Sequence, residues 1–142
     1  MKRVWHNNAR MHHFHYVGGK LFCEKLSVES LAQKFGTPLY IHSQRTLTDR
    51  FLQLDAALAP LDHMICYAMK ANSNLAVMRA LLNCGSGFDV VSAGELQRVI
   101  AAGGNPKKCS FAGVGKTEPE IEFALRIGIY SFNVESEPEL QR

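Results

Sequence analysis

Four short apolar runs recur at a nearly constant spacing in the second half of the chain. They are spaced by 23, 21 and 21 residues and begin near Ile65, Phe88, Cys109 and Tyr130. Each run has the length of a buried strand. A segment with the length and apolar pattern of a helix follows each of the first three, at residues 75–84, 93–102 and 118–127. This pattern predicts alternating strands and helices.

Sequence signals mark both ends of these predicted helices. Capping boxes, in which Ser or Thr precedes Glu by three residues, open two of them and the segment after the fourth strand: Ser92 with Glu95, Thr117 with Glu120, and Ser136 with Glu139. A glycine able to adopt a left-handed conformation follows each helix, at Gly85, Gly103 and Gly128. Four βα units in succession predict parallel strands joined by right-handed crossovers.

Three architectures use such units: a doubly wound sheet, a (βα)8 barrel and a leucine-rich solenoid. The chain lacks the leucine ladder of a solenoid, and KANSN follows the first strand where a dinucleotide fold would place GxGxxG. The sequence therefore predicts an α/β fold in which residues 63–142 form the first four βα units of a TIM-type barrel. A whole barrel needs about 250 residues. We therefore expect an incomplete chain, with one bare strand edge and an apolar inner face.

The region before this repeat has a different pattern. Residues 20–62 predict two short strands and two helices: LFCE (21–24), a helix over 28–35 opened by Ser27, LYIH (39–42), and a longer helix opened by Ser43 and stopped by Pro60. Residues 1–19 are polar and predict a flexible tail. We expect its histidines to titrate independently rather than to bind a metal: His6, His12, His13 and His15.

Composition narrows the class of protein. The 142 residues are 46% hydrophobic and 20% charged, which is typical of a soluble globular protein. A net charge of +3 without long basic runs gives no indication of a nucleic-acid surface. No apolar stretch approaches the roughly 20 residues of a membrane-spanning helix, and no secretory signal is recognisable. Four cysteines without a CxxC pair favour free thiols and a cytoplasmic location.

Polar residues follow the four predicted strands, at the end where βα enzymes place their chemistry. They are Lys70, Asp89 with Ser92, Gly113 to Lys116, and Asn133 with Glu135. Partial desolvation of Lys70 would give a nucleophilic amine that condenses with an aldehyde, pyridoxal phosphate being the commonest. Ala68 and Ala71 leave room for a flat ring. The alternative for Lys70 is a solvated surface charge.

Two neighbouring features leave more than one interpretation. Asp89 should be paired if it lies in a strand, with Lys70 as the expected partner; another buried ion pair or a turn-capping role is the alternative. GVGKT suggests a phosphate loop, but Ser110 stands where that motif needs glycine. A glycine turn leading into the Thr117 cap is favoured, with Lys116 solvated beside it.

Four segments carry a family resemblance. In order and spacing, YAMKANSN, GFDVVSAGEL, SFAGVGKTEPEI and FNVESEPEL resemble the N-terminal part of the diaminopimelate decarboxylases. These are pyridoxal-phosphate carboxy-lyases of the alanine racemase-like barrel group. The resemblance covers about Lys20 to Arg142. It implies that Lys70 holds pyridoxal 5'-phosphate covalently as the catalytic lysine, and that Ala68 and Asp89 line the cofactor pocket.

The resemblance also implies a reaction and an assembly. The reaction is decarboxylation of meso-2,6-diaminopimelate to L-lysine and CO₂ in lysine biosynthesis, by a full-length homodimer in which LFCE and LYIH join a second, β-rich domain. The groups that bind the cofactor phosphate and ring nitrogen would lie after Arg142, so we expect these 142 residues alone to be inactive. Two alternatives remain: another pyridoxal-phosphate barrel decarboxylase or racemase acting on a basic amino acid, and a truncated, non-catalytic carrier or regulator.

Overall fold

The computed structural model describes residues 12–141, which fall into two compact units. The first ends at Asp49 and the second begins at Arg50, so their boundary lies inside helix α2 (Gln44–Leu58). The boundary predicted from the sequence lies between residues 62 and 63. Residues 1–11 of the predicted tail, with His6, lie outside the described part of the chain.

The first unit is built on an antiparallel sheet with strand order β1-β2-β3. Its strands are β1 (Phe14–Val17), β2 (Lys20–Cys23) and β3 (Leu26–Ser27). Gly18 and Gly19 both have positive φ, as a two-residue hairpin turn between β1 and β2 requires. Helix α1 (Val28–Phe35) follows, and the Ser27 hydroxyl accepts a hydrogen bond from the Ser30 amide at its first turn, as predicted.

Two predictions for this unit are wrong. Ordered structure begins before Lys20, because residues 14–17 pair with β2. Within the predicted tail, His13 donates its backbone N–H to Thr46, and its ring lies 2.7 Å from the Asp49 carboxylate. Residues 39–42 form no strand, because no described segment pairs with them, and Tyr40 is 91% exposed.

The second unit contains a four-stranded parallel sheet in the order β4-β5-β6-β7. The strands are β4 (Cys66–Ala68), β5 (Gly87–Val90), β6 (Cys109–Phe111) and β7 (Ser131–Phe132). Between and after them come α3 (Leu75–Leu82), α4 (Ala93–Ala102), α5 (Glu118–Ile127) and α6 (Glu137–Leu140), with 3-10 turns η1 (Met69–Ala71) and η2 (Pro106–Lys108). The four predicted βα strands are confirmed.

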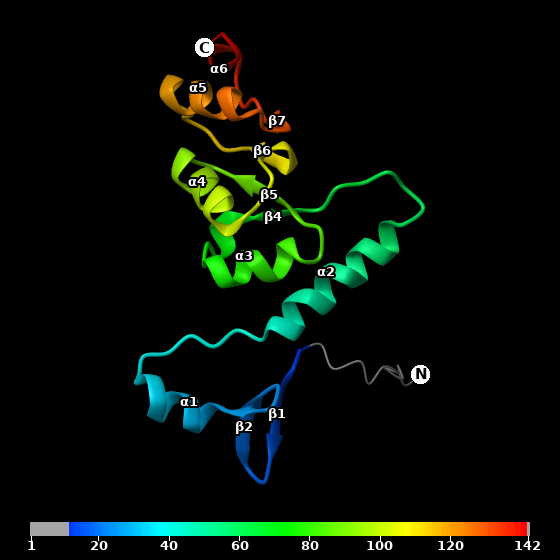
Figure 1. Ribbon diagram of the computed structural model, residues 1–142, viewed down its shortest axis with the longest axis vertical. Coiled ribbons are helices and arrows are strands. Elements are labelled where there is room, and N and C mark those ends of the chain that lie inside the picture. Colours follow the sequence, from blue (N-terminus) through cyan, green and yellow to red (C-terminus); the bar gives the residue numbers. More distant parts are fainter. Residues whose placement is uncertain (1–11, 142) are drawn as a thin grey trace, which may run out of the picture. The chain divides into compact units, whose positions relative to one another are not determined.

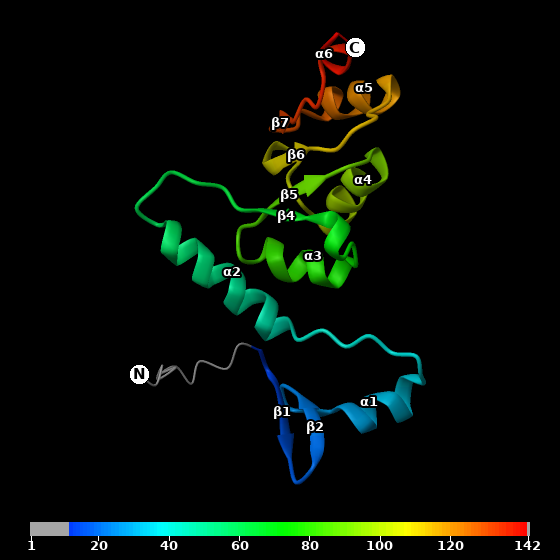
Figure 2. The same cartoon turned by 180° about the vertical axis from the view of Figure 1, so that it is seen from behind.

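The apolar core of this unit lies between the sheet and its helices. In Figures 1 and 2, α3, α4 and α5 lie along the same side of the strands. Side chains from both layers are buried there: Met69, Met78, Phe88, Val90, Leu96, Val99, Ala102, Cys109, Phe111 and Ala124. Because strand residues alternate between faces, the residues between these point away from the helices.

The other face of the sheet differs from the prediction. A row of small or polar residues crosses it in register: Ala68, Asp89, Ser110 and Ser131. The expected apolar inner face is therefore wrong. The strands are so short that each offers only one or two residues to this side, and in this row they are an alanine, an aspartate and two serines.

Candidate functional site

Lys70 lies in the 3-10 turn directly after β4, where the chain leaves the sheet. Met69 before it is 1% exposed and anchors the turn in the core, whereas Lys70 itself is exposed. Asn72 and Asn74 stabilise the loop that follows, since their side chains accept hydrogen bonds from the amides of Asn74 and Ala76. The loop that carries Lys70 is thus fixed at both ends, and the Lys70 side chain is exposed rather than partly desolvated as expected.

Asp89 lies beside Ala68, its register partner on the neighbouring strand. One carboxylate oxygen, Oδ1, is buried and has no hydrogen-bond partner among the described residues. Burial raises the pKa of the Cys66 thiol, and the nearby Asp89 carboxylate raises it further. Asp89 and Cys66 therefore lie close together on the same face of the sheet. A buried acceptor without a donor favours a ligand that donates a hydrogen bond.

The predicted ion pair between Lys70 and Asp89 is wrong. The ion pairs between residues 12–141 do not include it. The physical reason is position along the strand: Asp89 is level with Ala68, and Lys70 lies two residues further, in a turn outside the sheet. Among residues 12–141, Asp89 forms no other ion pair either, and its Oδ1 caps no turn.

Lys116 also differs from its prediction. It is 4% exposed rather than solvated, and its ammonium group donates to the carbonyls of Gly113 and Asn133 and to the Glu139 carboxylate. The turn before it is as predicted, since Gly113 and Gly115 both have positive φ. This turn bends the chain so that Lys116 lies over the Phe111 ring, 5.9 Å from its centre.

Glutamates at the predicted capping boxes fix the helix starts at this end of the sheet. The Glu120 carboxylate accepts hydrogen bonds from the Thr117 amide and hydroxyl and from the Ala93 amide of the preceding βα unit. These bonds, that of Ala93 first, lower the pKa of Glu120 below its usual range. Glu95 likewise accepts from the Val91 amide. Neighbouring units are thereby joined through their caps.

Ser110 and Ser131 are functional-site candidates that the sequence did not predict; with Ala68 and Asp89 they form the row across the sheet, here called the inner row. The Ser131 hydroxyl donates to Ser110 at 3.2 Å, and Ser110 donates to the Asn133 side chain at 3.4 Å. Alternation along CSF and SF could have indicated them, because each serine adjoins a phenylalanine that faces the core. Glu139, the partner of Lys116, was identified only as a capping residue.

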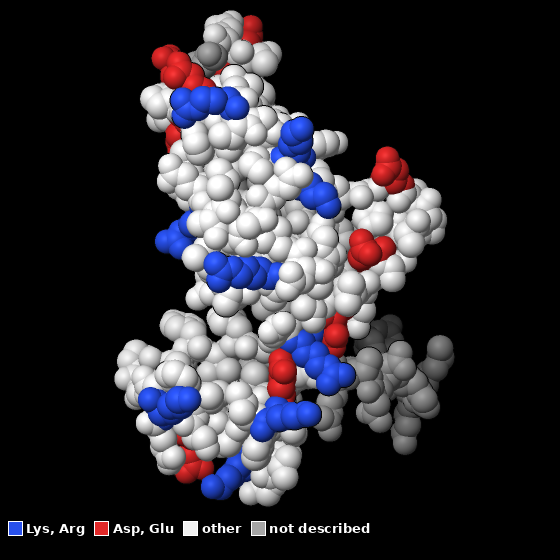
Figure 3. Space-filling model, in the orientation of Figure 1, with Lys and Arg blue, Asp and Glu red and all other residues white. Residues whose placement is uncertain are grey.

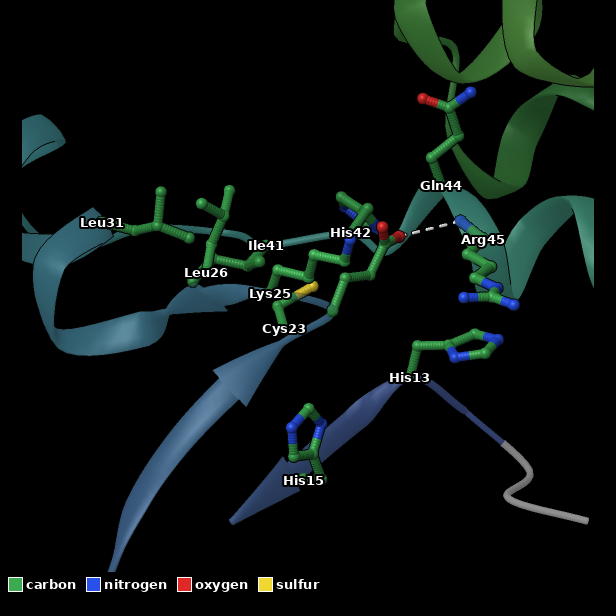
Figure 4. A pocket seen from close by; sticks show the side chains of 11 residues that line it. His13, His15, Cys23, Lys25, Leu26, Leu31, Ile41, His42, Gln44 and Arg45 are labelled. Carbon is green, nitrogen blue, oxygen red and sulfur yellow. Dashed lines mark hydrogen bonds between the residues drawn. The ribbon is translucent and has the colours of Figure 1, made fainter. Parts of the chain in front are cut away.

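A separate cavity of about 490 Å³ lies within the first unit. Figure 4 shows basic side chains around it, among them His13, Lys25 and Arg45. Glu24 accepts hydrogen bonds from the Arg45 amide and the Ser43 hydroxyl, which lower its pKa. These bonds hold the start of α2. None of the predicted site residues lines this cavity.

The described residues form neither a patch of like charge on the face in Figure 3 nor a group of metal ligands that would indicate a second functional site. On the face in Figure 3, basic and acidic side chains are interspersed within each unit. Residues 12–141 contain no cluster of three or more His, Cys, Asp or Glu side chains that could hold a metal ion. Over the same residues, no helix has the length and apolarity needed to cross a membrane.

Comparison with known proteins identifies the family. Residues 44–142 match the model of the pyridoxal-dependent decarboxylase family, pyridoxal binding domain. The diaminopimelate decarboxylase of Vibrio cholerae is 53% identical over 93% of this chain, which spans 32% of that relative.

Solved structures support the same fold. A crystal structure of a protein from Aquifex aeolicus has a TM-score of 0.86 and 44% identity, covering 91% of this chain and 32% of its own. A diaminopimelate decarboxylase from M. jannaschii, crystallised with L-lysine, has a TM-score of 0.85 and 35% identity, covering 90% of this chain and 31% of its own. The chain thus spans about a third of these relatives, with the α/β fold of their barrel. It belongs to the pyridoxal-dependent decarboxylases, and residues 44–142 match their pyridoxal-binding domain.

Proposed function

We propose that this chain is the N-terminal part of a diaminopimelate decarboxylase, which converts meso-2,6-diaminopimelate to L-lysine and CO₂ with pyridoxal phosphate. The observation that carries the proposal is the combination at the ends of β4 and β5. The exposed Lys70 lies two residues beyond Ala68, and Ala68 is the register partner of Asp89. The buried Oδ1 of Asp89 has no hydrogen-bond donor among the described residues. The 53% identity to a diaminopimelate decarboxylase supports this substrate.

The residues present suit this cofactor. Lys70 would hold it covalently through its amine, and the methyl side chain of Ala68 leaves space beside the strand end. Asp89 would accept a hydrogen bond through Oδ1 from the cofactor or the substrate amine, as a charge-assisted interaction. When bound, pyridoxal phosphate supplies an electron-withdrawing ring that stabilises negative charge at the substrate carbon that loses CO₂.

We also infer the setting in which this site acts. Residues 20–62 would contribute to a second, β-rich domain, and residues 63–142 would form part of the barrel. The separate antiparallel sheet of the first unit supports a β-rich part before the barrel, although the two units divide inside α2 rather than after residue 62. The family resemblance supports a cytoplasmic homodimer of full-length chains.

Reductive labelling tests the proposal. The protein as its gene encodes it is loaded with pyridoxal phosphate, reduced with borohydride, digested and mapped by mass spectrometry. We expect the label on the peptide containing residues 67–79, at Lys70. Lys70→Ala should lose the label, and the exposed Lys107→Ala should keep it. A label elsewhere would refute the assignment of Lys70.

Substrate assays separate the alternatives. CO₂ release from meso-2,6-diaminopimelate is compared with release from L-lysine, L-ornithine and L-arginine. Preference for diaminopimelate supports the proposal, whereas preference for another amino acid indicates a sister decarboxylase. Labelling at Lys70 without CO₂ release from any of them would indicate a racemase if the amino acid changes its chirality, and a non-catalytic carrier if it does not.

A further inference from the structure

Lys116 is a buried charge with an unusually complete set of partners. Its ammonium nitrogen lies 2.6 Å from the Gly113 carbonyl oxygen, 2.8 Å from that of Asn133 and 2.7 Å from Glu139 Oε1. An ammonium group has three N–H donors, so these acceptors match its capacity. The side chains of Lys116 and Glu139 are 3% and 9% exposed, which makes this a buried ion pair.

The three acceptors come from three different segments. Gly113 lies in the loop after β6, Asn133 directly follows β7, and Glu139 belongs to α6. The second oxygen of Glu139 accepts from the Glu135 amide at 2.8 Å, so the carboxylate also fixes the loop between β7 and α6. One ammonium group thus joins two loops at the end of the sheet where Lys70 lies.

Asn133 connects this cluster to the inner row. Its backbone carbonyl accepts from Lys116, and its side-chain oxygen accepts from Ser110 at 3.4 Å. Ser110 is the register partner of Asp89. A displacement of Asn133 would therefore disturb the polar row next to the carboxylate that we assign to the cofactor site.

Stability alone does not account for the pair. Burying two charges carries a desolvation penalty, and replacing both by apolar side chains of similar size is often neutral or stabilising. What such a replacement cannot reproduce is the pair of bonds to the Gly113 and Asn133 carbonyls. Geometry at the strand ends is the property that depends on Lys116.

We propose that Lys116 is a positioning residue for the pyridoxal-phosphate site, tying the loops after β6 and β7 to α6 so that Asn133 and the inner row keep their places. This inference rests on the proposed function. Lys116 acts through Asn133 and Ser110 and is not assigned contact with the cofactor.

The test compares Lys116→Met with the double variant Lys116→Met/Glu139→Met in the protein as its gene encodes it, loaded with pyridoxal phosphate. We measure hydrogen exchange of residues 113–116 and 133–136, the melting temperature, and KM and kcat for meso-2,6-diaminopimelate. In the single variant, exchange should accelerate and KM should rise about ten-fold, with a lowered melting temperature because the buried Glu139 carboxylate loses the cation beside it.

The double variant separates position from stability. We expect it to regain part of the lost melting temperature, because no buried charge is left without its counterion, while exchange and KM stay at the single variant's values. Recovery of all three would overturn the proposal by assigning Lys116 a purely structural role. Lys20→Met, which breaks the exposed pair with Glu29, is the matched control and should change neither exchange nor KM.

The two proposals fail in different ways. Reductive labelling at Lys70 is measured in the same samples. If the wild-type protein is not labelled there, the proposed function fails, although the exchange data still report whether Lys116 fixes the loops. If Lys70 is labelled but Lys116→Met exchanges and reacts as the wild type does, only the positioning role fails.

Discussion

The two faces of the β4–β7 sheet carry opposite chemistry on the same short strands. Toward the helices, Phe88, Val90, Cys109 and Phe111 are at most 1% exposed. On the other face, Ala68, Asp89, Ser110 and Ser131 form a row in which Asp89 Oδ1 has no hydrogen-bond partner among the described residues. Successive strand residues alternate between the faces. We infer that stability depends mainly on the helix-facing residues, and that the other row contributes little to it.

The strongest test of this difference is Phe111→Ala. Phe111 is fully buried and stacks on Phe132, with ring centres 5.8 Å apart. Loss of the ring leaves a cavity and should lower the free energy of unfolding by about 3–5 kcal/mol. Urea unfolding of the encoded protein measures this change.

The matched control is the adjacent residue on the other face. Ser110→Ala removes weak hydroxyl hydrogen bonds and should cost about 1 kcal/mol or less. Equal costs for the two substitutions would show that the faces do not divide stability as we infer.

A second prediction tests whether the polar face tolerates added volume. A Cβ at Gly87 would collide with the Lys108 carbonyl oxygen and lie 2.9 Å from the Cys66 sulfur. Since a backbone atom cannot yield easily, Gly87→Ala should cost about 1–3 kcal/mol in unfolding experiments. This result would show that the close approach of the Lys108 backbone requires glycine at position 87.

Gly94→Ala gives the contrast. Its Cβ would meet only the Ser92 hydroxyl, at 3.8 Å, and Gly94 lies within α4. Alanine there should stabilise the protein by about 0.5–1 kcal/mol. If Gly87→Ala were as favourable as Gly94→Ala, close packing at Gly87 would be excluded as a constraint.

Local signals in the sequence predicted the helix layer well. Helices α1, α4 and α5 have the predicted limits, because apolar periodicity and caps lie within each segment. Helix α3 is shorter than predicted and ends at Leu82. The amides of Cys84 and Gly85 bond three residues back, and Gly85 has positive φ, so the last turn is not α-helical.

Features that depend on contacts between distant parts of the sequence were not predictable from local signals. Lys116 is buried by acceptors 17 and 23 residues later, beyond any local pattern. Residues 39–42 have strand-like composition, yet a strand needs a partner, and none of the described segments provides one. The position of Lys70 after a strand was predictable, whereas its separation from Asp89 depended on the register between β4 and β5.

The smallest expected change in stability is for Asp89→Asn, and it should coincide with a loss of binding. Asn has nearly the same shape as Asp, and it replaces a carboxylate whose Oδ1 is buried without a donor among the described residues. The free energy of unfolding should therefore stay within about 1 kcal/mol of the wild type, or rise. A ligand that donates to the carboxylate loses a charge-assisted bond, so the cofactor or substrate should bind about ten-fold more weakly. Titration with pyridoxal phosphate, followed by its visible absorbance, and KM measure this. Asp55→Asn, at the exposed pair with His63, should leave both unchanged. Unchanged binding in Asp89→Asn, or a loss of stability as large as that of Phe111→Ala, would remove Asp89 from the site.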